Sequence, residues 1–192
     1  DDLIGAAVTD GRQDISLLTR TGHAMRFNED EVRSMGRVST GVKGITLRPG
    51  DEVVDMVVVR EDSTLLTICE KGYGKRTAQA EYPCKHRGGK GVIDIKTTER
   101  NGDVVACKEV QAEEEVMVVT QNGIMIRMPV EGLSTISRNT QGVRVINLDE
   151  GDRVIDMTRL PKSEDEILDY GSDNGGTTVD GKGDNGETNE GE

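Results

Sequence analysis

The sequence is poor in aromatic residues, with three tyrosines, one phenylalanine and no tryptophan among 192 residues. A core built from this chain must therefore be mainly aliphatic. Proteins that bind single-stranded nucleic acid without sequence preference stack the bases on aromatic side chains. The shortage of aromatic residues argues against that mode of binding.

The sequence also lacks the signals of secreted and membrane proteins. It has no apolar run of roughly 18 residues, the length that crosses a bilayer, and no charged and then apolar leader. The three cysteines, Cys69, Cys84 and Cys107, are odd in number and not closely paired, which favours reduced thiols in the cytoplasm. The chain opens with Asp1-Asp2 and not with Met, which indicates a fragment of something longer.

The net charge of −12 is spread unevenly along the chain. Residues 14–159 carry 21 Lys and Arg against 23 Asp and Glu, whereas residues 161–192 carry 2 Lys against 10 acids. The Gly-, Asp- and Asn-rich composition of this last segment predicts a disordered tail. A calcium site at Asp180, Asp184 and Glu187 is disfavoured, because their spacing is not that of an EF-hand loop.

An internal repeat organises the rest of the chain. Leu3, Val53, Val104 and Val154 occupy equivalent positions in similar segments, at intervals of 50, 51 and 50 residues. Each repeat then places a glycine at a turn and an arginine four residues later, on a segment that alternates like a strand. These pairs are Gly22 and Arg26, Gly72 and Arg76, and Gly123 and Arg127.

A third landmark is an arginine four residues before a Gly-Val pair, at Arg37, Arg87 and Arg138. In the second repeat this loop is His86-Arg87-Gly88-Gly89-Lys90-Gly91-Val92. Glycines let the backbone approach a ligand closely, and Arg and Lys side chains suit phosphate. An ordinary tight turn needs similar glycines, but recurrence in three repeats favours an anion-binding loop.

The second repeat predicts four β-strands, near residues 53–59, 64–69, 73–77 and 91–96, because β-branched runs there are bounded by turn residues. No segment has sustained helical periodicity, and only a short turn is expected near residues 30–34. Four strands in every repeat are typical of propeller blades. We predict an all-β, propeller-like partial disc of about three four-stranded blades, with repeats near residues 1–50, 51–102 and 103–151, a closing strand at 152–160 and the acidic disordered tail at 161–192.

Several stretches resemble the C-terminal domain of the DNA gyrase A subunit. They are Gly72-Tyr73-Gly74-Lys75-Arg76-Thr77, Glu81-Tyr82-Pro83, Arg87 to Val92, Thr98-Glu99-Arg100-Asn101-Gly102, and Arg138-Asn139-Thr140-Gln141-Gly142-Val143. The resemblance covers roughly residues 1–160 and implies a β-pinwheel, a propeller-like disc that exchanges strands between neighbouring blades, of which this chain would be the last three blades. In the family, a glycine-rich basic box lies in the first blade. His86 to Gly91 resembles that box but aligns with a later blade.

The resemblance implies a non-catalytic module that wraps duplex DNA around a basic rim, so that the whole ATP-dependent enzyme introduces negative supercoils. It implies three partners, which are double-stranded DNA, the rest of the gyrase A subunit, and the gyrase B subunit. It places the chain and these partners in the bacterial cytoplasm, in association with the nucleoid, and it implies no membrane partner. No cofactor is expected in this chain, since ATP and Mg²⁺ serve the whole enzyme. The catalytic tyrosine of the family lies outside it, so Tyr73, Tyr82 and Tyr170 are not assigned that role.

We predict that the repeated loops place Arg37, Arg87 and Arg138 at regular steps along the rim, where they meet successive phosphates. Adjacent cations that extend the predicted DNA-binding set are Lys43, Arg76, Lys85, Lys90 and Arg144. Phosphate contacts position DNA without specifying its sequence, so preference would come from DNA deformability. The alternative is structural, with the loop arginines paired to Asp51, Asp94 or Asp152.

The sequence is also compatible with other functions. The corresponding domain of topoisomerase IV has similar blades, although the acidic tail and the Tyr-Gly-Lys-Arg-Thr stretch favour gyrase. A protein-binding propeller without a nucleic-acid role would suit the negative charge. Zinc at Cys84 and His86 is disfavoured, since no second ligand pair follows at the required spacing. The tail itself is either an internal DNA mimic or a solubilising segment.

Overall fold

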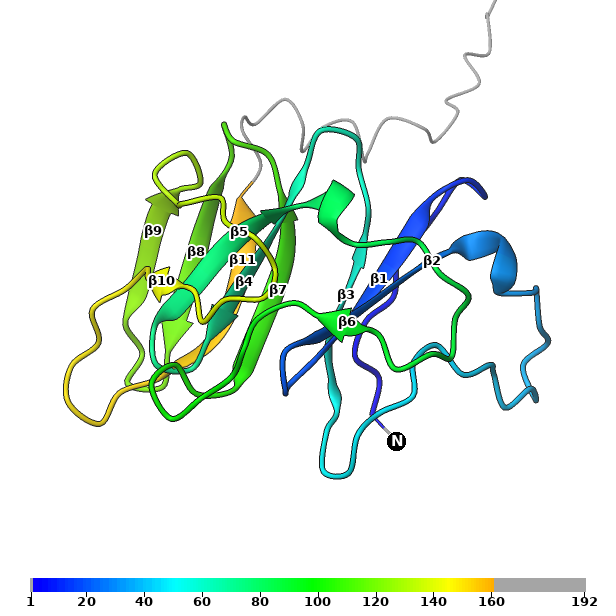
Figure 1. Cartoon of the computed structure of the whole chain (residues 1–192), viewed down its shortest axis with the longest axis horizontal. Helices are drawn as coiled ribbons and strands as arrows, with labels where there is room; N and C mark the ends of the chain where they lie inside the picture. Colours follow the sequence, from blue (N-terminus) through cyan, green and yellow to red (C-terminus); the bar gives the residue numbers. More distant parts are fainter. Residues whose placement is uncertain (1, 161–192) are drawn as a thin grey trace, which may run out of the picture. The chain divides into compact units, whose positions relative to one another are not determined.

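The computed structural model describes residues 2–160, so the predicted disordered tail at residues 161–192 lies outside the described residues. Over the described range the chain forms eleven β-strands and two short 3-10 helices, η1 (Glu29–Glu31) and η2 (Gln79–Glu81). Figure 1 shows the strands gathered into three small sheets. The predicted all-β architecture is confirmed, and η1 overlaps the start of the turn expected near residues 30–34.

The first sheet combines strands from two repeats. β1 (Asp14–Thr19) and β2 (His23–Asn28) form an antiparallel hairpin that turns at Gly22. β3 (Val53–Val58) pairs with β1, and the two-residue strand β6 (Val92–Ile93) pairs with β2. Gly22 has a φ of 80°, which glycine adopts readily because it has no Cβ. The strand order is β3-β1-β2-β6.

The second sheet repeats this arrangement. β4 (Thr64–Cys69) and β5 (Tyr73–Ala78) form its hairpin. β7 (Val104–Val110) pairs with β4, and the two-residue strand β10 (Val143–Arg144) pairs with β5. The order β10-β5-β4-β7 therefore again places a long strand of the next repeat at one edge and a short one at the other.

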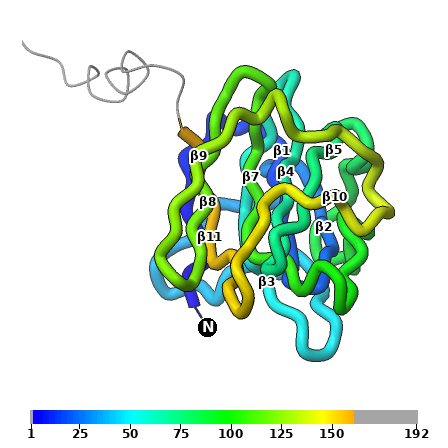
Figure 2. The backbone as a smooth tube through the Cα atoms, turned by 90° about the vertical axis from the view of Figure 1, so that its left-hand side faces the viewer, coloured from blue at the N-terminus to red at the C-terminus, as the bar shows by residue number. Residues whose placement is uncertain are grey.

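The third sheet has three strands within residues 2–160. β8 (Glu115–Thr120) and β9 (Met125–Pro129) form the hairpin, and β11 (Val154–Leu160) pairs with β8. The order is β11-β8-β9, so no described strand covers the far side of β9. Figure 2 turns this sheet toward the viewer.

The second and third repeats thus share their strands between two sheets. The four strands predicted in the second repeat all form, but β3 and β6 join the first sheet while β4 and β5 join the second. Alternating side chains mark a strand without identifying its partner, so the sequence alone placed all four in one blade. Residues 3–8, the counterpart of β3 in the first repeat, form no strand. The strand exchange is that of the β-pinwheel which the resemblance implies.

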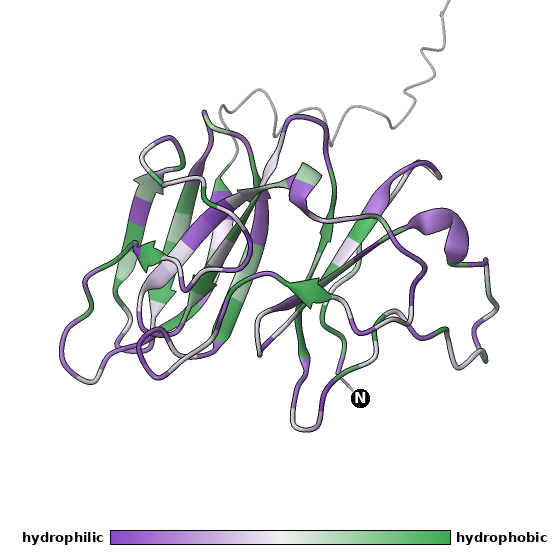
Figure 3. Ribbon diagram, viewed as in Figure 1, coloured by the Kyte–Doolittle hydropathy of each residue, from purple (hydrophilic) through white to green (hydrophobic). Residues whose placement is uncertain are grey.

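Aliphatic side chains fill the spaces between neighbouring sheets, as the composition predicts. Leu66 of the second sheet packs with Val116 and Val118 of the third, and Leu18 of the first packs with Leu65 of the second. Figure 3 shows apolar residues on the strands of all three sheets, interspersed there with hydrophilic ones. Burial of these aliphatic faces holds each sheet against the next.

A buried polar cluster joins the segment after β6 to the second sheet. The side chains of Lys75 and Asp94 are 0% and 1% exposed, and Lys75 Nζ lies 3.3 Å from Asp94 Oδ1. The hydroxyls of Thr67 and Tyr82 donate to the same carboxylate at 2.7 and 2.5 Å, and Lys75 also donates to the Thr77 hydroxyl at 2.6 Å. Burial lowers the pKa of Lys75, and the Asp94 carboxylate opposes that change.

All three cysteines are free, as their odd number predicts. Cys69 and Cys107 are buried, whereas Cys84 is exposed. Burial raises the pKa of the Cys69 thiol to about 12, so this thiol stays protonated at neutral pH. Buried thiols of this kind are inert packing groups.

Candidate nucleic-acid interface

The loops that carry the predicted DNA contacts lie along one edge of the sheets. β7 packs against both β3 and β11, and we call the edge formed by these three strands the inner side. β6 and β10 occupy the opposite edge of their sheets, and residues 83–91 and 134–142 lead into them (Figure 1). We call β6 and β10, together with these two loops, the outer edge.

Arg87 holds its loop against the preceding repeat. Its Nε donates to the carbonyl of Glu31 and its Nη1 to the carbonyl of Lys43, both at 2.9 Å. The amide of Arg87 donates to Glu31 Oε2 at 3.0 Å, and His86 Nδ1 lies 3.2 Å from Glu31 Oε1. The arginine is therefore tied to backbone carbonyls while the rest of the loop faces outward.

Arg138 repeats this arrangement in the next loop. Its Nη1 donates to the carbonyl of Ile93 at 2.9 Å, and its amide donates to Glu81 Oε2 at 3.2 Å. Its guanidinium also lies 6.0 Å from the centre of the Tyr82 ring. Because Glu81 and Ile93 occupy the positions of Glu31 and Lys43 in the next repeat, both arginines make the same inter-repeat contact.

The acidic residues that the structural alternative pairs with the loop arginines have other partners. Asp51 accepts hydrogen bonds from the amide and hydroxyl of Thr21, and Asp152 accepts one from the amide of Asn122. Asp94 belongs to the buried cluster. The expected pairing with these acids is therefore wrong for Arg87 and Arg138, since both arginines bind carbonyl oxygens of the preceding repeat instead.

Four of the predicted cations are exposed and make no ion pair with any residue between 2 and 160. They are Arg37, Lys43, Lys85 and Lys90. Lys43 reaches the outer edge because its segment lies beside the loop of the second repeat. The Gly88 amide donates to the Gly44 carbonyl at 2.6 Å, and the Thr46 amide donates to the Gly89 carbonyl at 2.8 Å. These contacts bring lysines from two repeats to one surface.

A further cationic pair surrounds Tyr73 at the start of β5. The guanidinium carbons of Arg100 and Arg144 lie 4.7 and 4.9 Å from the centre of its ring, and Arg144 Nη2 donates to the Tyr73 hydroxyl at 2.8 Å. Hydrogen bonding from Arg100, followed by that from Arg144, outweighs burial and lowers the pKa of the Tyr73 phenol. Arg144 was in the predicted set, whereas Arg100 was missed because only the fold brings its turn beside Tyr73.

Arg76 has a supporting contact of its own. It is half-buried, and its Nε donates to the carbonyl of Leu133 at 2.9 Å. Its counterpart Arg26 donates Nη1 to the carbonyl of Gln79 at 2.8 Å. The repeated glycine and arginine landmark therefore marks a strand residue that anchors the next repeat.

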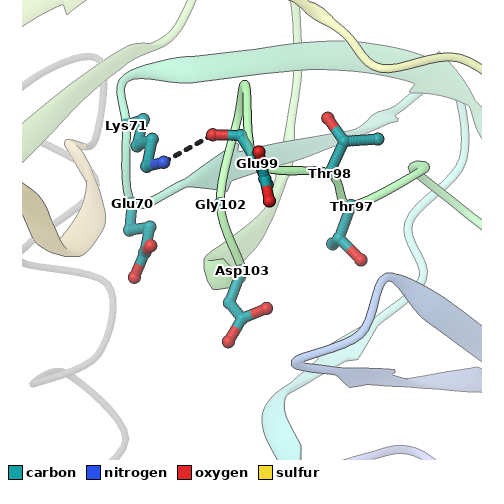
Figure 4. Close-up of a pocket in the computed structure, with 7 residues that line it drawn as sticks. All are labelled: Glu70, Lys71, Thr97, Thr98, Glu99, Gly102 and Asp103. Carbon is teal, nitrogen blue, oxygen red and sulfur yellow. Dashed lines mark hydrogen bonds between the residues drawn. The ribbon is translucent and has the colours of Figure 1, made fainter.

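An open hollow of about 320 Å³ lies between the turns after β4 and before β7 (Figure 4). Glu70, Glu99 and Asp103 contribute carboxylates to its lining, and Lys71 Nζ donates to the carbonyl of Glu99. Carboxylates repel phosphate, so this hollow does not suit the backbone of DNA. Within residues 2–160 no three His, Cys, Asp or Glu side chains are placed to hold a metal, and no helix there is long and apolar enough to cross a bilayer.

A family model described as the DNA gyrase C-terminal domain, beta-propeller, matches residues 13–60, 63–111 and 114–161. Each matched segment starts just before a hairpin and ends just after the strand that completes the inner side of the same sheet. The family model therefore repeats three times across the chain.

Curated relatives include the DNA gyrase A subunit of Salmonella typhimurium, 44% identical over 170 residues, which are 88% of this chain and 19% of that protein. The DNA gyrase A subunit of Escherichia coli is 45% identical over 166 residues, which are 86% of this chain and 19% of that protein. This chain thus spans about a fifth of the length of the curated relatives it matches.

Among solved structures, a DNA gyrase A C-terminal domain is 28% identical with a TM-score of 0.74, over 78% of this chain and 51% of that one. A C-terminal domain of DNA topoisomerase IV is 23% identical with a TM-score of 0.77, over 85% of this chain and 53% of that one. The second likeness shows a shared fold.

Proposed function

The chain belongs to the DNA gyrase C-terminal domain family, and on this premise we propose that its outer edge binds duplex DNA and bends it around the sheets. The observation that carries the proposal is the repeated loop. The second and third repeats hold it by the same arginine-to-carbonyl contact. Beside it lie the exposed lysines Lys43, Lys85 and Lys90 of the first and second repeats, which make no ion pair with residues 2–160.

We assign the cations two roles. Arg76, Arg87 and Arg138 support the loops through carbonyl oxygens, and Arg37 joins them as the counterpart of Arg87 and Arg138 in the first repeat. The side chains assigned to contact phosphate are Lys43, Lys85, Lys90, Arg100 and Arg144. Arginine and lysine both bind phosphate, and a held guanidinium loses less conformational freedom when it does so.

The interface suits the DNA backbone better than the bases. Its contacts come from short loops along the outer edge, and neither a helix nor a β-ribbon of residues 2–160 is placed there to enter a groove. Bending a site of about 20–30 base pairs costs of order 1–6 kcal/mol. Phosphate contacts release counterions, and several of them along the edge can offset that cost. Sequence preference would then follow DNA deformability.

The larger role rests on the relatives, of which this chain spans about a fifth. We propose that the chain acts as a non-catalytic part of a bacterial gyrase. Its partners would be duplex DNA in the cytoplasm, the remainder of the gyrase A subunit, and the gyrase B subunit. Wrapping in one chiral sense would direct a DNA segment so that the ATP- and Mg²⁺-dependent enzyme introduces negative supercoils. The strand-breaking chemistry would lie outside this chain.

The direct test is the salt dependence of affinity for linear duplex DNA. Replacing Lys43, Lys85 and Lys90 by alanine, singly and together, should reduce the slope of log affinity against log salt by up to about 0.9 for each lost contact. Arg153→Ala is the matched control, because this exposed arginine adjoins β11 on the inner side of the third sheet. An unchanged slope in the triple variant, or an equal loss in the control, would contradict the proposal.

A further inference from the structure

Two exposed arginines meet at the hydroxyl of Tyr73. Arg144 Nη2 donates to this hydroxyl at 2.8 Å, and the Arg100 side chain also hydrogen bonds with it. The guanidinium carbons of Arg100 and Arg144 lie 4.7 and 4.9 Å from the centre of the same ring. Tyr73 is only 7% exposed, whereas both arginines are exposed. Two positive charges are therefore held at the surface around one neutral hydroxyl.

A buried asparagine fixes the turn that carries Arg100. Asn101 is 0% exposed, its Oδ1 accepts the Thr98 amide at 2.7 Å, and its Nδ2 donates to the Gln141 carbonyl at 3.1 Å. Gln141 lies three residues before Arg144, so the two arginines come from segments that are bonded to each other. Side chains that are already positioned lose less conformational freedom when they bind a ligand.

The strand that carries Arg144 is fixed as firmly. β10 places Arg144 directly opposite Tyr73 in the register of the second sheet. The Gly72 carbonyl accepts the amides of Val145 and Ile146 at 2.9 and 3.1 Å, which holds β10 beside the start of β5. The second sheet packs against both the first and the third sheets, so the site lies within the middle sheet of the described part of the chain.

The charges of this cluster suit an anion. Neither Arg100 nor Arg144 makes an ion pair with a residue in the range 2–160, and like charges held close together repel each other. Stacking on the tyrosine ring offsets part of that repulsion, and an anion between the guanidiniums would remove it. Each guanidinium has five N–H donors, and a hydroxyl that accepts a hydrogen bond can still donate its own proton. Three side chains can therefore donate to the same ligand.

The first sheet has the same backbone arrangement without this chemistry. His23 occupies the position of Tyr73, and Ile93 lies opposite it where Arg144 lies in the second sheet. An isoleucine side chain has no donor for an anion. The cluster is therefore a feature of the second sheet and not of every repeat, so the recurring landmarks of the sequence do not predict it.

We propose that Arg100, Arg144 and the Tyr73 hydroxyl together bind a single phosphate of duplex DNA. The site rests on the proposed function of the outer edge and makes one shared contact of two arginines. The guanidiniums supply charge-assisted hydrogen bonds to the non-bridging oxygens, and the hydroxyl between them fixes where the phosphate sits. Lysines bind phosphate as point charges on flexible stems, so this cluster is the part of the interface that sets the position of the DNA backbone.

The salt dependence of affinity for linear duplex DNA distinguishes one shared phosphate from two. With a shared phosphate, the double variant Arg100→Ala with Arg144→Ala should lower the slope of log affinity against log salt by up to about 0.9 in total, and each single variant by no more. Two separate phosphates would lower it by about 1.8 in the double variant. Arg153→Ala on the inner side is the control and should keep the slope. An unchanged slope in the double variant, or a loss near the larger value, would overturn the proposal.

Tyr73→Phe tests the hydroxyl without removing a charge. Phenylalanine keeps the buried ring and both arginines, so the slope should stay unchanged while the affinity falls about three- to tenfold at every salt concentration. Tyr82→Phe is the matched control, because the Tyr82 hydroxyl donates to the buried Asp94 carboxylate. The control should lower stability to urea and keep the DNA affinity. An undiminished affinity in Tyr73→Phe, or an equal loss in the control, would refute the role of the hydroxyl.

The same titrations separate this site from the proposed function on which it rests. If the combined Lys43, Lys85 and Lys90 alanine variant keeps its slope, the proposed function of the outer edge is wrong. If that variant loses slope while the double arginine variant keeps it, the outer edge binds DNA and only the shared phosphate site is wrong. Loss of slope in both variants, within the limit given for one shared phosphate, is the result we expect.

Discussion

Replacing Asp94 by alanine should destabilise the protein by about 3–5 kcal/mol, because it leaves Lys75 buried without its counter-charge. Both side chains are almost fully buried, at 0% and 1% exposure. The carboxylate also accepts the hydroxyls of Thr67 and Tyr82, and an unpaired buried hydroxyl costs about 1–3 kcal/mol. These losses share one acceptor and do not simply add, so we expect the upper part of the range.

Urea unfolding at neutral pH, followed by circular dichroism, measures this change. The matched control is Glu115→Ala, which breaks the ion pair with Arg127 on the surface, where the two side chains are 36% and 65% exposed. An exposed pair contributes about 1 kcal/mol or less. A double-mutant cycle with Asp94→Asn and Lys75→Met should give a coupling energy between these two side chains of about 2 kcal/mol. If Asp94→Ala costs no more than Glu115→Ala, the buried cluster does not hold the repeats together.

Because Arg87 supports its loop, Arg87→Ala should lower the free energy of unfolding in urea by about 1–3 kcal/mol, since the substitution leaves loop carbonyls unpaired. The slope of log DNA affinity against log salt should stay unchanged. A reduced slope would show that Arg87 contacts phosphate. Burial raises the pKa of Asp51, but hydrogen bonds from Thr21 outweigh it and bring the pKa below the ordinary 3.8. Its stabilisation should be present above that value and be lost as pH falls through the lower folded pKa, and Asp51→Asn should flatten this part of the acid-unfolding curve. Gly91→Ala should cost about 1–3 kcal/mol more than Gly151→Ala in thermal unfolding, because only the first would clash with a carbonyl oxygen; equal costs would contradict the packing described here.

The strands could be predicted from the sequence because their signals are local. The runs at residues 53–58, 64–69 and 73–78 are bounded by turn residues, and the glycine at each hairpin recurs at a constant interval. Strand partners could not be assigned from alternation, since pairing joins residues far apart in the chain. This is why β3 and β6 were expected in the same blade as β4 and β5.

The candidate site was predicted in part. The recurring Arg87 and Arg138 loops do lie at one edge, but nothing local indicates that these arginines bind carbonyl oxygens of the preceding repeat. Lys75 lies in a strand motif among polar residues, yet it is fully buried because Asp94 arrives from a distant loop. Arg100 joins the site only through the contact of its turn with Tyr73.

The proposed bending of duplex DNA by the outer edge is tested most directly by the linking number of DNA that is closed in the presence of the chain. A nicked circle is saturated with the full chain, ligated, stripped of protein and compared with a circle ligated alone. Bending around the chiral disc predicts a shift in linking number of one sign that grows with bound protein. The combined Lys43, Lys85 and Lys90 alanine variant should abolish the shift, and Arg153→Ala should keep it. An unchanged linking number at saturating occupancy would contradict the account.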